Sequence, residues 1–329
     1  MSLFSAVAEF FKPEPPPDPT VAKALNRVAE LTDPLLKLAP DFAKHLTLPV
    51  EYALGYCDGL IAALPGPIDI NRRAFSVDPL VHALFATAGD IDQMLGRSQA
   101  VRDFLALPEC WESNHFYAMF VARRQQKRQF GVRQQGDVVQ SDVPQKVLYF
   151  SNHTLVEPSS QLEQTQQRLR GTALDSLLRT FHDHVAALRH EREGLRSDVS
   201  VERAHLTVLR GATPGRELAV HTRHLAELDS HLRETAASLL PEQLLKSLAE
   251  FLLAPEQALR VVPCSVAVDR LGVIQEEVVE DMSVTTLSFP ELYTRDQRLH
   301  LAMLARISRD EAREAVETVS DQQHRFLVI

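Results

Sequence analysis

Apolar residues between about 159 and 253 recur at alternating intervals of four and three, the pattern of a helix that packs along a narrow line against another helix. In the first half these positions are Leu174, Leu178, Phe181, Val185, Leu188, Arg192, Leu195, Val199, Glu202, Leu206 and Leu209. In the second half they are Leu218, His221, Leu225, Leu228, Leu232, Thr235 and Leu239. The pattern predicts an antiparallel coiled-coil hairpin.

The turn of this hairpin is predicted independently at residues 211–215. Gly211 can take the left-handed conformation that ends a helix, and Thr213-Pro214 can begin the next one. A turn centred there places apolar positions of one helix opposite apolar positions of the other. The facing pairs are Leu209 with Leu218, Val199 with Leu228, Leu195 with Leu232 and Leu188 with Leu239. Pro241 is then expected to break or kink the second helix.

Residues 20–125 are predicted to form a helical bundle. Helix starts are expected at Asp18-Pro19, Leu48-Pro49, Asp78-Pro79 and Ser98. Residues 110–125 read as a further helix, although the aromatic segment 116–121 could also be a strand. A bundle is the natural way to bury the apolar faces of several short helices.

Residues 126–157 and 259–329 are predicted to form one strand-rich module. Lys146–Phe150 and the valines from 261 to 268 are typical of strands, and Ser308-Arg-Asp-Glu311 is a capping box that starts a final helix. The fold class expected is therefore α+β, predominantly α-helical. It comprises an N-terminal helical bundle, a small antiparallel sheet, and an antiparallel coiled-coil hairpin at 158–258 inserted between the two parts of the sheet.

Residues 1–19 are expected to be an amphipathic peptide followed by a proline-rich linker. The apolar residues fall on one face of a short helix, and they are Leu3, Phe4, Val7, Phe10 and Phe11. A helix this short needs a surface to fold on. We expect it to bind a protein partner or, equally well, to pack on the protein's own body. Contact of residues 2–11 with a membrane surface is a weaker alternative, because only Lys12 supplies positive charge.

Composition limits the function classes. The formal net charge of −9 makes nucleic acid an unlikely partner, because phosphate would be repelled overall. No apolar run is long enough to predict a transmembrane helix. Three scattered cysteines without metal-type spacing indicate reduced thiols and a cytoplasmic protein.

Polar residues interrupt the apolar line of the hairpin at Glu202 and His221, with His205 close by. Carboxylate and imidazole are suitable zinc ligands, so Glu202, His205 and His221 form a candidate metal site. The more common interpretation is that such polar residues fix the register of the two helices. We expect no other cofactor.

A basic run at Arg123, Arg124, Lys127 and Arg128 is a candidate anion-binding patch, with Arg133 nearby. The alternative interpretation is a solvated helix end, where the helix dipole favours positive side chains. The sequence matches none of the common phosphate-binding or catalytic motifs.

These observations favour a non-catalytic cytoplasmic interaction or scaffolding protein, in which the coiled-coil arm and the N-terminal peptide engage partners. Protein partners are expected, including a second copy of the chain. One alternative is an enzyme or ligand-binding protein with a site between bundle and sheet. A second is a nucleic-acid-associated factor that uses the patch at 123–133. Exposed apolar residues on the outer face of the arm would favour the first, and a deep polar pocket would favour the enzyme.

Overall fold

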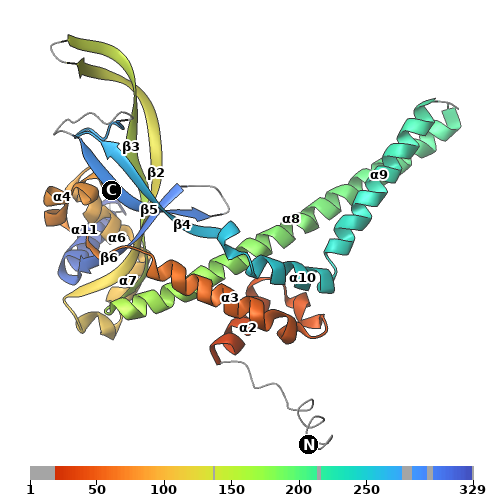
Figure 1. The fold of residues 1–329 in the computed structure, drawn as a ribbon, viewed down its shortest axis with the longest axis horizontal. Helices are drawn as coiled ribbons and strands as arrows, with labels where there is room; N and C mark the ends of the chain where they lie inside the picture. The colour runs from red at the N-terminus through yellow and green to blue at the C-terminus, as the bar shows by residue number, and fades with distance from the viewer. Residues whose placement is uncertain (1–18, 136–137, 213–215, 276–283, 295–298, 328–329) are drawn as a thin grey trace, which may run out of the picture. The chain divides into compact units, whose positions relative to one another are not determined.

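The computed structural model describes residues 19–135, 138–212, 216–275, 284–294 and 299–327 (Figure 1). The elements of these residues are α2 (Pro19–Leu31), η1 (Pro34–Leu38), α3 (Phe42–Ala62), β1 (Ile68–Asp69), α4 (Arg72–Val77), α5 (Pro79–Leu84), α6 (Ala88–Arg97), α7 (Gln99–Leu105), η2 (Pro108–Trp111), β2 (His115–Gln135), β3 (Val138–Ser159), α8 (Leu162–Ala212), α9 (Arg216–Ser238), α10 (Pro241–Leu252), η3 (Pro255–Gln257), β4 (Leu259–Val268), β5 (Thr285–Thr294), β6 (Leu299–Ser308) and α11 (Arg309–Leu327). The predicted α+β class, predominantly helical, is confirmed. The N-terminal peptide 1–12 and the turn residues 213–215 lie outside the described residues.

The chain forms two compact units, each built from two segments. One consists of the chain up to Gly55 together with Asp175–Ala254, and the other consists of Tyr56–Leu174 together with the chain from Pro255. This division differs from the predicted domains, because α3 and α8 each contribute residues to both units.

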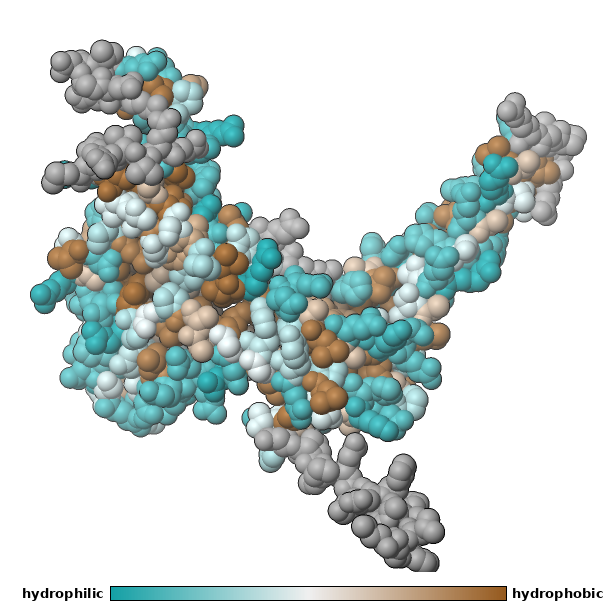
Figure 2. Space-filling view, in the orientation of Figure 1, coloured by the Kyte–Doolittle hydropathy of each residue, from teal (hydrophilic) through white to brown (hydrophobic). Residues whose placement is uncertain are grey.

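In the first unit, α8 and α9 form the predicted antiparallel helical hairpin (Figure 1). Its surface is mostly hydrophilic, with hydrophobic residues scattered along it (Figure 2). The least exposed positions of its distal part are those of the predicted apolar line. On α8 they are Arg192, Leu195, Val199, Glu202, Leu206 and Leu209. On α9 they are Leu218, His221, Leu225, Leu228, Leu232 and Thr235, followed by Leu239 just after the helix; Asp229 and Ala236 of α9 are also partly buried. The sequence therefore predicted both the hairpin and the side of each helix that faces its partner.

The base of the hairpin packs against α2 and η1 of the same unit. Asp33 caps η1 by accepting a hydrogen bond from the Leu35 amide, and its carboxylate also pairs with Arg189 of α8. His182 bonds the Thr32 carbonyl through Nδ1 at 2.7 Å. The Asp33 side chain is only 2% exposed. Its hydrogen bond from the Leu35 amide and its ion pair with Arg189 together compensate for burying its charge.

The second unit contains one sheet in the order β3-β2-β6-β5-β4, and β1 pairs in parallel with β6. The strands from either side of the hairpin therefore share one sheet, as predicted. The edge strand β3 also bonds the turn that follows β4, since the Leu148 amide donates to the Gly272 carbonyl at 2.9 Å and the Ile274 amide donates to the Lys146 carbonyl at 2.8 Å. These bonds connect the two edges and curl the sheet on itself.

Residues 115–125 belong to a strand, which is the alternative that the sequence left open for 116–121, and not to the helix that was predicted. Only Pro108–Trp111 is helical, as a short 3-10 turn, and β2 begins at His115. The alternate residues Phe116, Ala118, Phe120 and Ala122 are fully buried, which is the two-residue period of a strand with one face in the core. The helical bundle predicted for 20–125 therefore extends too far.

The helix starts predicted from capping residues and prolines are confirmed at some positions and wrong at another. Asp78 and Ser98 cap α5 and α7 as predicted, and Ser308 accepts a hydrogen bond from the Glu311 amide at the start of α11. The predicted start at Leu48-Pro49 is wrong, because α3 begins at Phe42 and Pro49 lies inside it. Proline costs a helix one hydrogen bond, and the buried neighbours Leu46 and Val50 compensate for it.

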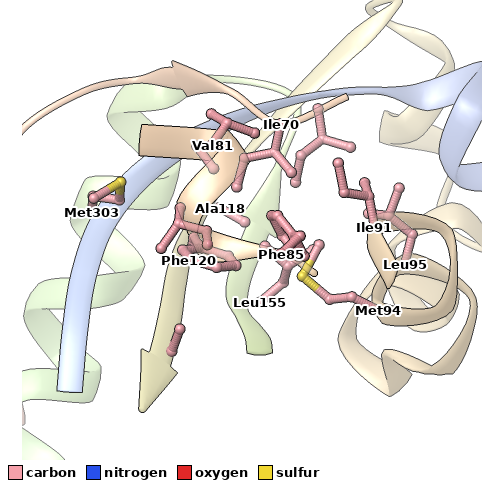
Figure 3. Close-up of a cluster of buried hydrophobic side chains, with 14 of the residues drawn as sticks. Ile70, Val81, Phe85, Ile91, Met94, Leu95, Ala118, Phe120, Leu155 and Met303 are labelled. Carbon is pink, nitrogen blue, oxygen red and sulfur yellow. The ribbon is translucent and has the colours of Figure 1, made fainter. Parts of the chain in front are cut away.

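The core of the second unit lies between the sheet and the short helices (Figure 3). Phe120 of β2 and Phe85 meet with ring centroids 5.8 Å apart. On α6, Gly96 approaches α11 so closely that a β-carbon there would lie 2.5 Å from the Ala315 carbonyl oxygen and from Val319 Cγ2. The α6–α11 contact thus depends on a residue without a side chain.

Replacing Gly96 with alanine should destabilise the second unit by about 1–3 kcal/mol, because the added methyl group overpacks a closed contact. Urea unfolding of the two proteins measures the difference. The matched control is Gly171→Ala, where the added methyl group meets nothing within 4 Å and should be neutral or slightly stabilising. Equal loss in both variants, or none in either, would contradict this contact.

Replacing Leu195 and Leu232 together with aspartate should open the distal hairpin, because two carboxylates would be buried without partners at a cost of several kcal/mol. Hydrogen exchange should accelerate across 192–235 and stay unchanged in β2, β5 and β6. The control places aspartate at the exposed positions Ser197 and Ala226. Exchange that is equally slow in the double variant and the control would show that the assigned facing positions are wrong.

Candidate functional sites

Glu202, His205 and His221 come together in the distal hairpin. Glu202 and His205 are three residues apart on α8, so both project from one side of that helix, and His221 reaches them from α9. His221 Nδ1 lies 2.7 Å from Glu202 Oε1, and the ring centroids of the two histidines are 4.4 Å apart. One possible ligand atom from each residue lies within 4.8 Å of the other two.

The burial of this cluster is graded. The Glu202 side chain is 12% exposed and the His221 side chain is 30% exposed, while His205 is open to solvent. Val199 and Leu206 beside them are buried in the apolar line. The cluster is thus anchored on its inner side and accessible on its outer side.

Two further polar contacts cross between the helices. His231 Nε2 lies 3.2 Å from Glu191 Oε1, and the Arg203 guanidinium lies 2.9 Å from Asp229 Oδ1. In the heptad frame the first pair lies on one side of the apolar line and the second on the other. These pairs define the two sides of the hairpin.

Three exposed valines lie on the side of the Glu191–His231 pair. Val201 is 65% exposed, Val208 is 69% exposed and Val220 is 59% exposed. Val201 and Val208 are seven residues apart and share one face of α8. Val220 has the equivalent heptad position on α9, and equivalent positions of two antiparallel helices lie on the same side of the pair. We call these three residues the valine face.

Charge is balanced along the hairpin. Residues 189–239 contain equal numbers of arginine and acidic residues, so the formal net charge of −9 belongs to the rest of the chain. A protein surface that approaches the hairpin meets no overall repulsion, and a polyanion meets no overall attraction.

The basic run at 123–128 does not form one patch. Its residues lie in strand β2 and not at a helix end, so Lys127 and Arg128 point to opposite faces. Both are exposed, whereas Arg123 is half-buried. Arg124 is turned inward, where it pairs with Glu291 and lies 3.2 Å from Cys264 Sγ.

The inward cluster around Arg124 was not predicted from the sequence. Glu291 is 5% exposed, and it also accepts a hydrogen bond of 2.9 Å from the Tyr293 hydroxyl, which raises the pKa of Tyr293. The Nε of Arg124 is buried without a hydrogen-bond partner. The two ends of this ion pair are far apart in the sequence, so no local pattern indicates that they meet.

A surface cavity of about 650 Å³ lies in the second unit, between α6 and the strand segment 150–155. Asp90, Arg97, Asn152 and His153 are among its lining residues. His153 Nε2 lies 2.7 Å from the Leu84 carbonyl, and its ring stacks on Phe85 with centroids 4.7 Å apart. The imidazole is therefore committed to structural contacts.

Lowering the pH should destabilise the second unit through His153. Burial lowers the pKa of this histidine, against smaller opposing effects of the Leu84 hydrogen bond and the Asp90 charge. The unfolded chain therefore takes up the proton first, so stability is lost as the pH falls below about 6.5 and on through the folded pKa.

His153→Gln removes this titration and keeps an N–H donor for the Leu84 carbonyl. Urea midpoints between pH 7.5 and 5 should fall less steeply for the variant than for the wild-type protein. Parallel pH profiles would mean that His153 does not carry this pH dependence.

Among the described helices, none has a stretch long and apolar enough to cross a membrane. Comparison of the chain with protein-family models, with curated proteins and with solved structures finds no match.

Proposed function

We propose that this chain is a non-catalytic interaction protein whose hairpin acts as a coiled-coil arm for a protein partner. The observation that carries the proposal is the valine face. Its three side chains remain 59–69% exposed, whereas the leucine side chains of the distal hairpin are buried or half-buried in the line between the two helices. Covering a large apolar side chain contributes roughly 1.5–3 kcal/mol, so a helical partner laid along this side would gain appreciable binding energy.

The form of the arm supports the same proposal. Two helices that pack along their length hold the valine face on a stiff support, so binding requires little ordering of the arm. Its balanced charge allows a second copy of this chain or another acidic protein to approach. A partner helix with apolar residues spaced by seven would match Val201 and Val208, and this is how helices recognise grooves and seams.

The two other candidate functions have less support. The His153 imidazole at the 650 Å³ cavity already bonds the Leu84 carbonyl, so it is poorly placed to transfer protons for an enzyme. Arg124 is engaged by Glu291, and the remaining basic residues of its run lie on different faces, which weakens a phosphate-binding role. We retain residues 2–11 as a second proposed docking element, which includes Leu3, Phe4, Val7, Phe10 and Phe11.

We place this function in the cytoplasm. Cys57 and Cys110 are free and buried, and burial raises the pKa of the Cys57 thiol to about 12. Free thiols that are buried are compatible with the reducing environment expected from the scattered cysteines.

The valine face is tested by replacing Val201, Val208 and Val220 with serine in the full chain. Self-association is measured by sedimentation, and partner binding by affinity capture followed by binding assays with each captured protein. We expect at least one association to weaken tenfold or more at an unchanged melting temperature. The control replaces the exposed residues Val77 and Leu271 of the other unit with serine. Associations of equal strength in the triple variant and the wild-type protein would refute the proposal.

A further inference from the structure

The polar cluster of the arm has the composition and geometry of a transition-metal site. We propose that Glu202, His205 and His221 bind one Zn²⁺ ion that connects α8 to α9. The proposal is independent of the partner-binding function, because it concerns an ion held within a single chain.

The ligand chemistry favours zinc over the hard cations. Two imidazole nitrogens and one carboxylate oxygen are a common protein ligand set for zinc, with water in the fourth position. Magnesium and calcium require mainly oxygen ligands, which this cluster does not offer.

The distances require only small side-chain movements. Zinc bonds nitrogen and oxygen at about 2.0–2.2 Å, so neighbouring ligand atoms around one tetrahedral ion lie roughly 3.4 Å apart. The three ligand atoms already lie within 4.8 Å of one another, although one pair is drawn closer by the hydrogen bond between His221 and Glu202. Rotation of three side chains on two fixed helices can bring them to a common centre.

The protonation states change on binding. Where His221 Nδ1 donates its hydrogen to Glu202, that nitrogen must give up the hydrogen before it can bind the ion. A neutral imidazole then carries its hydrogen on Nε2 after exchange with solvent, whereas an imidazolium releases one proton to solvent. The lone pairs of two imidazoles and one carboxylate oxygen then replace water ligands of the hydrated ion. The charge of Glu202 offsets part of the charge of zinc in a half-buried location.

The position of the cluster suits a structural link with access from outside. Val199 and Leu206 bury its inner side, so the helix segments that carry Glu202 and His205 are held in place by packing. His205 is exposed and lies between Val201 and Val208 along α8, so the ion can enter from solvent on the side of the valine face. An ion bound here would tie the two helices together close to the tip of the arm.

The test uses full-length protein without an affinity tag, freed of metal by a chelator, and titrated calorimetrically with ZnCl₂ or MgCl₂. We expect binding of one zinc per chain at micromolar or lower concentration, with no competing binding of magnesium. Hydrogen exchange around 199–225 should slow when zinc is added. The substitutions Glu202→Gln, His205→Ala and His221→Ala should each weaken zinc binding at least tenfold and abolish the change in exchange.

His205→Ala is the decisive variant, because its exposed side chain contributes little to packing and its loss should leave the hairpin folded. The matched controls are His224→Ala and His231→Ala, two exposed histidines of the same arm, which should bind zinc like the wild-type protein. Wild-type protein that binds no zinc below millimolar concentration would overturn the proposal. So would equal affinity in the His205 variant and the controls.

Discussion

The pairing of α8 with α9 along a narrow line of mainly aliphatic side chains is the constraint on which the arm depends. In the distal hairpin, each helix presents only one strip of its surface to the other, and nearly every position outside that strip faces solvent. Hairpins of this kind gain their stability from the strip itself, because helix propensity alone is weak. The strip therefore fixes which residues are exposed, and through them what the arm can bind.

The base of the arm differs from the distal hairpin, because a charged side chain is buried where α8 packs against α2 and η1. Asp33 is almost completely buried, yet it both caps η1 and pairs with Arg189. Removing one partner of such a pair leaves the other as an uncompensated buried charge. The pair therefore favours one way of placing α2 and η1 against α8. Aliphatic packing thus determines the distal hairpin, while packing together with specific polar contacts determines its base.

The sequence predicted the features that local periodicity and capping control. The facing positions of the hairpin and the helix starts at Asp78 and Ser98 depend on residues close together in the chain. The cluster of Glu202 with His221 was also predicted, because the register followed from the apolar pattern. Residues 110–125 were misassigned because a short aromatic segment satisfies both helical and strand periodicity until its partner strands are known.

The features that the sequence did not predict depend on contacts between distant residues or on the exposure of single side chains. The pair of Arg124 and Glu291 joins strands that are distant in the chain, and no pattern near either residue indicates it. The valine face was missed for another reason. Valine is apolar whether it faces the partner helix or solvent, so residue type alone does not distinguish a buried valine from an exposed one. The heptad frame could have identified Val201, Val208 and Val220, since all three lie off the positions that face the partner helix.

The central claim is that one side of the arm contacts a protein partner, and site-specific photo-crosslinking tests it most directly. A photoreactive residue is placed at Val208 on the valine face or at Ala226, which is exposed on the other side of the hairpin. Our account predicts a discrete protein adduct in cells from position 208 and none of comparable yield from position 226. Equal adducts from both positions, or no adduct from 208, would contradict it.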